Sequence, residues 1–513
     1  MTTTWADLVG TALLGTDRRG GTPEVLLDSA ALAVVRRRAG ARPATAWVRP
    51  ATAPHDPRPP LPAAARQRLA LLLADRATGS GQSGRRGRAP SLGELLPQWL
   101  TEANSRGYAA PPELLPALLD AARARTDLRP DALALAGPRG LWLASLNADW
   151  SFALRAGASG VHPDTGDPDA VRTLWEEGLF AERVALLARL RARDPGRARE
   201  LLRSGWAAER AEDRLMFLDS LREGLSPQDE PFLEQALTDR SRTVRATAAE
   251  LLSALPGSAL AARMATRART CVAWDPVGDR IGVEAPYACD AAMERDGVVA
   301  IPPAGRGERA WWFGQVVDAA PLATWRERFG GRTPREIIEL PVADDWQADL
   351  HAAWCRAAVR QGDAAWARAL LGPTPDPATV LSPVGDPAKL LSVLPAPERA
   401  RWVARFIEAH GLSEAFQMLA VCAVPWAAPL GAAVVDALDI ARDAGSYPWS
   451  FSGVMGLAER CMDPAEADRA APLAAVPAES AHTSPGAGAY WAEAFQRLVG
   501  TLRLRAAMIA ELA

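Results

Sequence analysis

Three segments near the middle of the chain repeat one apolar spacing, and this repeat limits the possible folds more than any other sequence feature. The segments are AERVALLARLRA (Ala181–Ala192), AEDRLMFLDSLR (Ala211–Arg222) and TVRATAAELLSALP (Thr243–Pro256). Leu187 corresponds to Leu218 and then to Leu252, at separations of 31 and 34 residues. Shorter predicted helices that begin at Pro195 and Pro227 lie between them, and proline suits a first helical turn. Helical periodicity that returns at this interval is typical of stacked helix pairs.

The third repeat resembles a HEAT unit in detail. Asp239 can cap the second helix or pair with an arginine. It precedes Val244, Arg245, Ala248 and Leu252, in which the apolar positions face the neighbouring pair and the small Ala248 permits close helix approach. One such unit cannot bury its apolar face alone, so neighbouring units must stack. We therefore expect a mainly α fold, a HEAT-like α-solenoid of helix pairs with a small β-rich insert.

The β-rich insert is expected where the helical pattern stops. Cys271–Trp274, Arg280–Glu284 and Val298–Ile301 alternate or run apolar between Asp-Pro, Val-Gly and Pro-Pro pairs, which favours short strands. We divide the chain into an N-terminal helical region with Pro-rich and Gly/Arg-rich loops (residues 1–130), HEAT-like repeats (131–265), the insert (266–310) and a C-terminal helical region (311–513).

The N-terminal region is expected to begin with an amphipathic helix. Trp5, Val9 and Leu13 recur at helical spacing, and Gly15 suits a left-handed helix end. A second helix is predicted from Ala30. Six prolines in residues 50–62 predict a loop, because proline lacks the amide hydrogen that an element needs. Residues 79–90 (GSGQSGRRGRAP) predict another, flexible and basic loop.

Charge and cysteine usage limit the environment of the protein. The 513 residues carry a net charge of −3, so the basic excess of a dedicated nucleic-acid binder is missing. The N-terminus has no basic region before an apolar core, and no apolar run is long enough to span a bilayer. Five scattered cysteines favour reduced thiols over a disulfide framework. We expect a cytoplasmic protein with no membrane contact.

Catalytic and metal motifs are not found in the sequence. His351 and Cys355 lie one helical turn apart, and Cys271 and Cys289 would complete four ligands, but the spacing rules for zinc are not met. The GxSxG and HExxH patterns are missing, and none of the five histidines lies beside a suitable Ser or Cys. We assign no catalytic residue, no metal and no cofactor.

Two groups of residues are candidates for binding. Tryptophan is unusually frequent, with 18 Trp against 4 Tyr, and Trp311 and Trp312 open a Trp-rich stretch that forms either a partner groove or helix-packing core. The second group is polar, and its alternative role is local capping and ion pairing. Its members are Arg18, Arg19, Trp142, Asn147, Asp149 and Trp150.

Three segments resemble an uncharacterised bacterial protein family: WADLVGTALLGTDRR at the start, GPRGLWLASLNADW from Gly137, and the helical stretch Trp175–Pro256. Members of that family are encoded beside MoxR-type AAA+ ATPases, von Willebrand factor A-domain proteins and SWIM zinc-finger proteins. No catalytic residues are established for the family. The resemblance implies a partner in an ATPase-driven system that handles or matures other proteins.

We expect a non-enzymatic scaffold or adaptor that binds protein partners, such as an AAA+ ATPase or a von Willebrand A-domain protein, on the long surface of stacked helices. Two alternatives stay open. A HEAT-like nucleic-acid-binding protein or DNA-repair-type enzyme would have an arginine-lined concave face. A hydrolase with a dispersed site would have a deep pocket with converging carboxylates or a metal.

Overall fold

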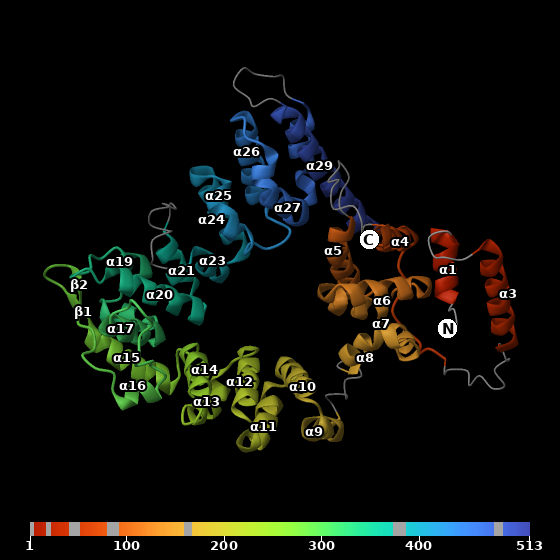
Figure 1. Ribbon diagram of the computed structural model, residues 1–513. Coiled ribbons are helices and arrows are strands. Elements are labelled where there is room, and N and C mark those ends of the chain that lie inside the picture. Colours follow the sequence, from red (N-terminus) through yellow and green to blue (C-terminus); the bar gives the residue numbers. More distant parts are fainter. Residues whose placement is uncertain are drawn as a thin grey trace. The chain divides into compact units, whose positions relative to one another are not determined.

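The structure, a computed structural model, describes residues 5–16, 22–40, 52–78, 92–158, 167–372, 386–476 and 486–513. The chain folds into two compact units, an N-terminal unit of Met1–Pro54 and a main unit of His55–Ala513. Within the described ranges both are built from helices, apart from a two-stranded sheet in the main unit (Figure 1). The prediction of a mainly α fold with a small β element is confirmed at this level.

In the described part of the N-terminal unit, helices α1 (Trp5–Leu14) and α3 (Pro23–Gly40) pack against each other. Gly15 ends α1 as predicted: its φ of 87° is left-handed, and its N–H donates to the Thr11 carbonyl at 3.0 Å. The second helix begins earlier than the predicted Ala30, because a proline at the first position presets the helical φ.

The first core of the main unit lies among helices from residues 63 to 158. They are α4 (Ala63–Thr78), α5 (Leu92–Ser105), η2 (Pro112–Leu114), α6 (Leu115–Ala124), η3 (Thr126–Leu128), α7 (Arg129–Leu146), η4 (Ala148–Trp150) and α8 (Ser151–Ala158). The proline-rich residues 52–62 form the predicted loop. Arg58 fixes it to α7 by donating to the carbonyls of Ala134 at 2.7 Å and Leu135 at 3.1 Å. A Cβ at Gly137 would lie 2.1 Å from Nη2 of Arg58, so only glycine fits beside this anchor.

The second core begins with the repeated segments. Its first helices are α9 (Pro168–Glu177), α10 (Phe180–Arg193), α11 (Pro195–Gly205), η5 (Trp206–Ala208), α12 (Ala211–Asp219), η6 (Ser220–Arg222), η7 (Pro227–Asp229), α13 (Glu230–Ala236), α14 (Arg242–Ser253) and α15 (Ala259–Cys271). Helix α10 contacts α12, α12 contacts α14, and α14 contacts α15. The corresponding leucines Leu187, Leu218 and Leu252 are all fully buried in this core. Residues 31 and 34 positions apart thus share one apolar interior.

The insert is smaller in β content than expected. Strands β1 (Val272–Asp275) and β2 (Arg280–Val283) pair antiparallel, with Val272 opposite Val283, and α16 (Ala291–Arg295) follows. Val298–Ile301, predicted as a third strand, is not one. Side chains of the next helix satisfy its backbone instead: Val299 donates to Gln315 Oε1 at 2.8 Å and accepts from Trp311 Nε1 at 2.8 Å. Periodicity alone cannot distinguish such a segment from a strand.

The remaining helices complete the second core. They are α17 (Glu308–Ala319), α18 (Ala323–Arg328), α19 (Pro334–Ile338), α20 (Gln347–Gln361), α21 (Ala364–Leu371), α23 (Pro387–Val393), α24 (Ala396–His410), α25 (Leu412–Leu419), α26 (Ala428–Asp443), η8 (Pro448–Phe451), α27 (Ser452–Cys461), η9 (Pro464–Glu466), α28 (Ala467–Ala470), η10 (Ala471–Ala474) and α29 (Ala487–Glu511). None of the helices in the described ranges combines the length and the apolar character that a bilayer-spanning segment needs.

The last helix, α29, belongs to both cores. Leu502 is buried in the second core, whereas Met508 and Leu512 at its end are buried in the first. Figure 1 shows this end beside α4 and α5, and Glu511 pairs with Arg68 of α4 at 2.7 Å. Two parts of the chain more than 400 residues apart are thus joined by one helix.

The predicted division of the chain differs from these cores. The boundary at residue 130 falls at the start of α7, which packs on α6 within the first core. The boundaries at 265 and 310 fall inside α15 and α17. Proline-rich and glycine-rich stretches mark loops, whereas a core is defined by contacts that close across such loops.

Candidate functional site

The Trp-rich stretch lies mostly in the interior of the second core. The indole of Trp312 is 7% exposed and donates to the Ala300 carbonyl at 2.8 Å, and the half-buried Trp311 binds Val299 in the same way. Trp325 and Trp354 are fully buried with ring centroids 5.8 Å apart. Trp311 and Trp312 hold residues 299 and 300 against α17, and Trp325 and Trp354 fill the core.

The polar candidates lie at the end of α7. Asn147 ends the helix, and its Oδ1 accepts the Asp149 N–H at 3.1 Å. Asp149 pairs with Arg123 at 3.2 Å, and Trp150 Nε1 donates to Asp120 at 3.0 Å. The structure therefore brings these residues together by capping and ion pairing. Trp142 is half-buried on α7, and Arg18 and Arg19 lie outside the described residues.

The four metal-ligand candidates are not gathered into a site. In the described ranges, no three His, Cys, Asp or Glu side chains are placed to hold one ion. Burial raises the pKa of the Cys355 thiol to about 12 and lowers the pKa of His351 to about 4. Cys271 is also buried, whereas Cys289 is half-buried. A neutral thiol at this depth is neither a nucleophile nor a ready metal ligand.

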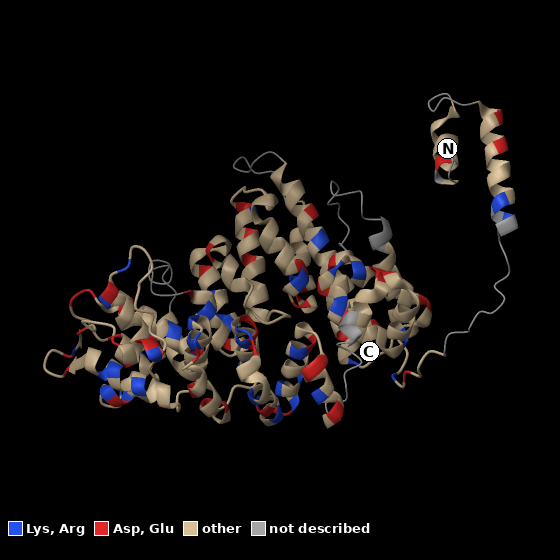
Figure 2. Ribbon diagram, turned by 60° about the horizontal axis from the view of Figure 1, so that its bottom comes forward, with Lys and Arg blue, Asp and Glu red and all other residues tan. Residues whose placement is uncertain are grey.

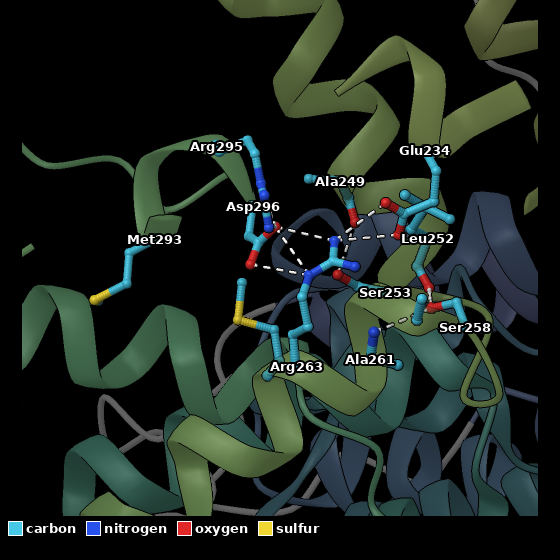
Figure 3. Close-up of polar contacts among 12 residues, drawn as sticks. Glu234, Ala249, Leu252, Ser253, Ser258, Ala261, Arg263, Met293, Arg295 and Asp296 are labelled. Atoms are coloured by element: carbon cyan, nitrogen blue, oxygen red, sulfur yellow. Dashed lines mark hydrogen bonds and ion pairs between the residues drawn. The ribbon is translucent and has the colours of Figure 1, made fainter. Parts of the chain in front are cut away.

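A buried carboxylate, Asp296, connects α13, α15 and α16 (Figure 3). It accepts hydrogen bonds from Arg263 at 3.1 Å and Arg267 at 2.7 Å, and Arg295 lies 3.1 Å away. Arg263 also binds Glu234 of α13 at 3.1 Å. Burial by itself would raise the pKa of the Asp296 carboxyl, but the three arginines outweigh it and hold that pKa below its ordinary value. An acid kept ionised and enclosed in this way anchors helices and does not transfer protons.

A second buried carboxylate, Asp229, has the same role between α10 and α11. Arg191, also fully buried, donates to it through Nη1 and Nη2, each at 3.0 Å, and Arg199 adds a bond at 3.0 Å. The Ser226 N–H donates to Asp229 as well, at 3.0 Å. The sequence analysis missed this cluster, although the Ser226–Asp229 spacing is that of a capping box and was a readable signal.

Both described helices of the N-terminal unit carry exposed apolar side chains, which we call together the N-terminal apolar face: Val9 and Leu13 on α1, and Val25, Leu32 and Val35 on α3. Leu13 is 82% exposed and Val35 61% exposed. Val9 and Leu13 lie four residues apart, hence on one side of α1, while Leu8 is buried. Several large apolar side chains gathered on two short helices are unusual for an unpartnered surface.

A groove of about 500 Å³ lies on the main unit along α19, α21 and α24. Ile338, Leu394 and Trp402 form its apolar part, and the ion pair between Arg368 and Glu398 lies along it. Figure 2 shows basic and acidic residues interspersed over the helices of the main unit. The groove has an apolar part and a charged rim of three arginines, Arg335, Arg368 and Arg405, and two glutamates, Glu339 and Glu398.

Comparison with known proteins gives a family but no activity. No curated protein and no solved structure matched the chain. Residues 7–512, nearly the whole chain, match the profile of a family of unknown function, DUF5691. The chain therefore belongs to the DUF5691 family.

Proposed function

We propose that the protein is a non-enzymatic adaptor whose N-terminal apolar face binds a partner protein. The observation that carries this proposal is the exposure of Val9 and Leu13 at helical spacing on α1. Apolar anchors one turn apart are the pattern by which a helix enters a groove on another protein. Burying these side chains against a partner would stabilise the complex by roughly 25 cal/mol for each Å² of apolar surface removed from water.

The main unit is the scaffold in this proposal. The helix pairs from α10 to α15 are taken as HEAT-like units of a solenoid, and the groove along α19, α21 and α24 as a second surface for protein segments. The partner class follows from the family resemblance: a MoxR-type AAA+ ATPase or a von Willebrand A-domain protein in the cytoplasm.

Co-purification with the tagged full-length chain, with and without ATP, tests the proposal. An AAA+ ATPase or A-domain protein, identified by mass spectrometry, is expected with the wild type. The double substitution Val9→Glu and Leu13→Glu should reduce its recovery by about tenfold or more, because buried anchors dominate interface energies.

The matched control is Leu71→Glu, which changes an exposed leucine on α4 of the main unit. This variant should retain the partner at the wild-type level. Equal recovery with the Val9→Glu/Leu13→Glu variant would contradict a docking role for the N-terminal apolar face. Absence of any ATPase or A-domain protein from the wild-type eluate would contradict the partner class.

A further inference from the structure

A cavity of about 330 Å³ lies where the first core meets the second. Helix α5 contributes Trp99, and the end of α29 contributes Met508 and Leu512. Val424 and Pro464 come from segments beside α26 and α27. The cavity is mostly apolar and opens to solvent between Val424 and Ile509, which are exposed. Its size is within the range that binds small molecules, and boundaries between packed parts of a protein are where such cavities occur.

The distinguishing feature of this junction cavity is Arg505. Its side chain lines the cavity although the residue is only 6% exposed. Its Nη1 donates to the backbone carbonyls of Glu459 at 3.3 Å and Met462 at 2.5 Å. Within the described ranges no carboxylate lies close enough to Arg505 for an ion pair: Asp463 acts on it only as a nearby charge, and Glu459 is paired with Arg497 at 2.7 Å. Burial accordingly lowers the pKa of Arg505.

The other deeply buried arginine shows how unusual this arrangement is. Arg191 is 1% exposed, and Asp229 balances its charge through two hydrogen bonds. A buried cation without a paired anion costs several kcal/mol, so such groups are normally paired. Arg505 is therefore a buried positive charge beside an apolar cavity, with two carbonyls in place of a carboxylate.

A second polar group in the cavity wall lacks a partner. Trp99 is 1% exposed, and its indole Nε1 has no hydrogen-bond acceptor in the described structure. Glu102 also lines the cavity, but its charge is balanced by Arg106 at 2.8 Å. The cavity wall thus presents one cation without an ion-paired carboxylate, Arg505, and one indole donor without an acceptor, Trp99, and together these complement an anionic acceptor.

We propose that the junction cavity binds a small amphipathic carboxylic acid, with its carboxylate against Arg505 and its hydrocarbon body among Trp99, Met508 and Leu512. The guanidinium fork matches the geometry of a carboxylate. A monoanion is favoured over a phosphate group, because Arg505 carries a single charge and a dianion would leave a second charge beside the buried apolar wall unbalanced. This site is independent of the N-terminal apolar face, so either proposal can fail alone.

Isothermal titration calorimetry of the full-length protein with octanoate, octan-1-ol and octylamine tests the proposal. Octanoate should bind saturably at one site per chain and about tenfold or more tighter than octanol, since a desolvated charged hydrogen bond exceeds 1.4 kcal/mol. Octylamine, with the same chain and the opposite charge, should bind more weakly than octanol. Equal binding of octanoate and octanol would overturn the proposal, as would no binding of octanoate.

Two variants locate the site. Arg505→Gln should remove the preference for octanoate over octanol while a donor to the Glu459 and Met462 carbonyls remains. Ile509→Trp, at the half-exposed wall of the cavity, should block octanoate without changing Arg505. Its matched control is Ile440→Trp, an exposed isoleucine on α26 outside the cavity lining, which should bind octanoate like the wild type. Unchanged octanoate binding in Ile509→Trp would place the ligand elsewhere and overturn the assignment.

Discussion

His351 shows at the scale of one residue how burial sets the chemistry of this protein. It lies on α20 and stacks on Trp354 with ring centroids 5.6 Å apart, and its Nε2 finds no hydrogen-bond partner among the described residues. Burial lowers its pKa from 6.5 to about 4. The imidazole is therefore neutral in the folded state at pH values where it is charged in the unfolded chain.

Stability is expected to decrease as the pH falls from 6.5 towards 4. In this window the unfolded state binds a proton at His351 and the folded state does not, so the free energy of unfolding falls, by about 3 kcal/mol over the full window. His351→Phe keeps an aromatic ring at this position but removes the titratable imidazole. Urea unfolding at several pH values should therefore show a smaller loss for this variant than for the wild type.

The control for this comparison is His55→Phe, which changes an exposed histidine and should retain the wild-type pH dependence. A His351→Phe profile parallel to that of the wild type would show that other groups cause the acid sensitivity. The buried Asp229 and Asp296 affect stability only at lower pH. Their pKa values are held below the ordinary 3.8, so the stabilisation from their ion pairs is lost only as the pH falls beneath that value.

Asp229 is expected to be a strong determinant of stability. Asp229→Asn retains the shape of the side chain but leaves Arg191 as a buried charge without an anion, which should lower the free energy of unfolding by about 3–5 kcal/mol. Asp219→Asn, which breaks the exposed pair with Arg222, should change it by less than about 1 kcal/mol. Urea denaturation of the two variants measures the difference. A decrease in the free energy of unfolding of less than about 1 kcal/mol in both variants would show that the buried network contributes no more than the exposed pair.

At the scale of elements, the sequence predicts long amphipathic helices well and short elements poorly. The predicted helix at Ala181–Ala192 appears as α10 within one residue at each end, because several turns of apolar spacing define one face. The short helices α18, α19 and α28 were not predicted, since a single turn carries almost no periodic signal. Their ends are set by packing and capping.

The candidate sites could be predicted less well than the long helices, because most of their residues are not neighbours in the sequence. The end of α7 was recognised as a polar cluster because Asn147, Asp149 and Trp150 are adjacent in sequence. The junction cavity combines Trp99 with Arg505, which no local pattern relates, because only the closure of α29 onto α5 brings them together. Val9 and Leu13 were correctly placed on a helix, but their exposure depends on what that helix packs against.

At the scale of the main unit, α29 is the element on which the two cores depend. Its large buried apolar residues from Trp491 to Leu502 belong to the second core, and Met508 and Leu512 belong to the first. The pairs Arg68–Glu511 and Arg460–Glu94 add polar contacts at the same junction. Because the two cores share this helix, unfolding of one core removes packing from the other. We therefore expect the main unit to unfold cooperatively.

Arg503→Pro tests this coupling, because residue 503 lies on α29 between the parts buried in each core. Proline there removes a backbone hydrogen bond and kinks the helix, at a cost of about 3 kcal/mol or more. Differential scanning calorimetry should show one main-unit transition in the wild type and two in this variant, as each core then unfolds at its own temperature. Arg503→Ala removes the same exposed pair with Asp468 but retains the helix, and it should behave like the wild type. Two transitions in the wild type, or a single shifted transition in Arg503→Pro, would show that the cores are not coupled through α29.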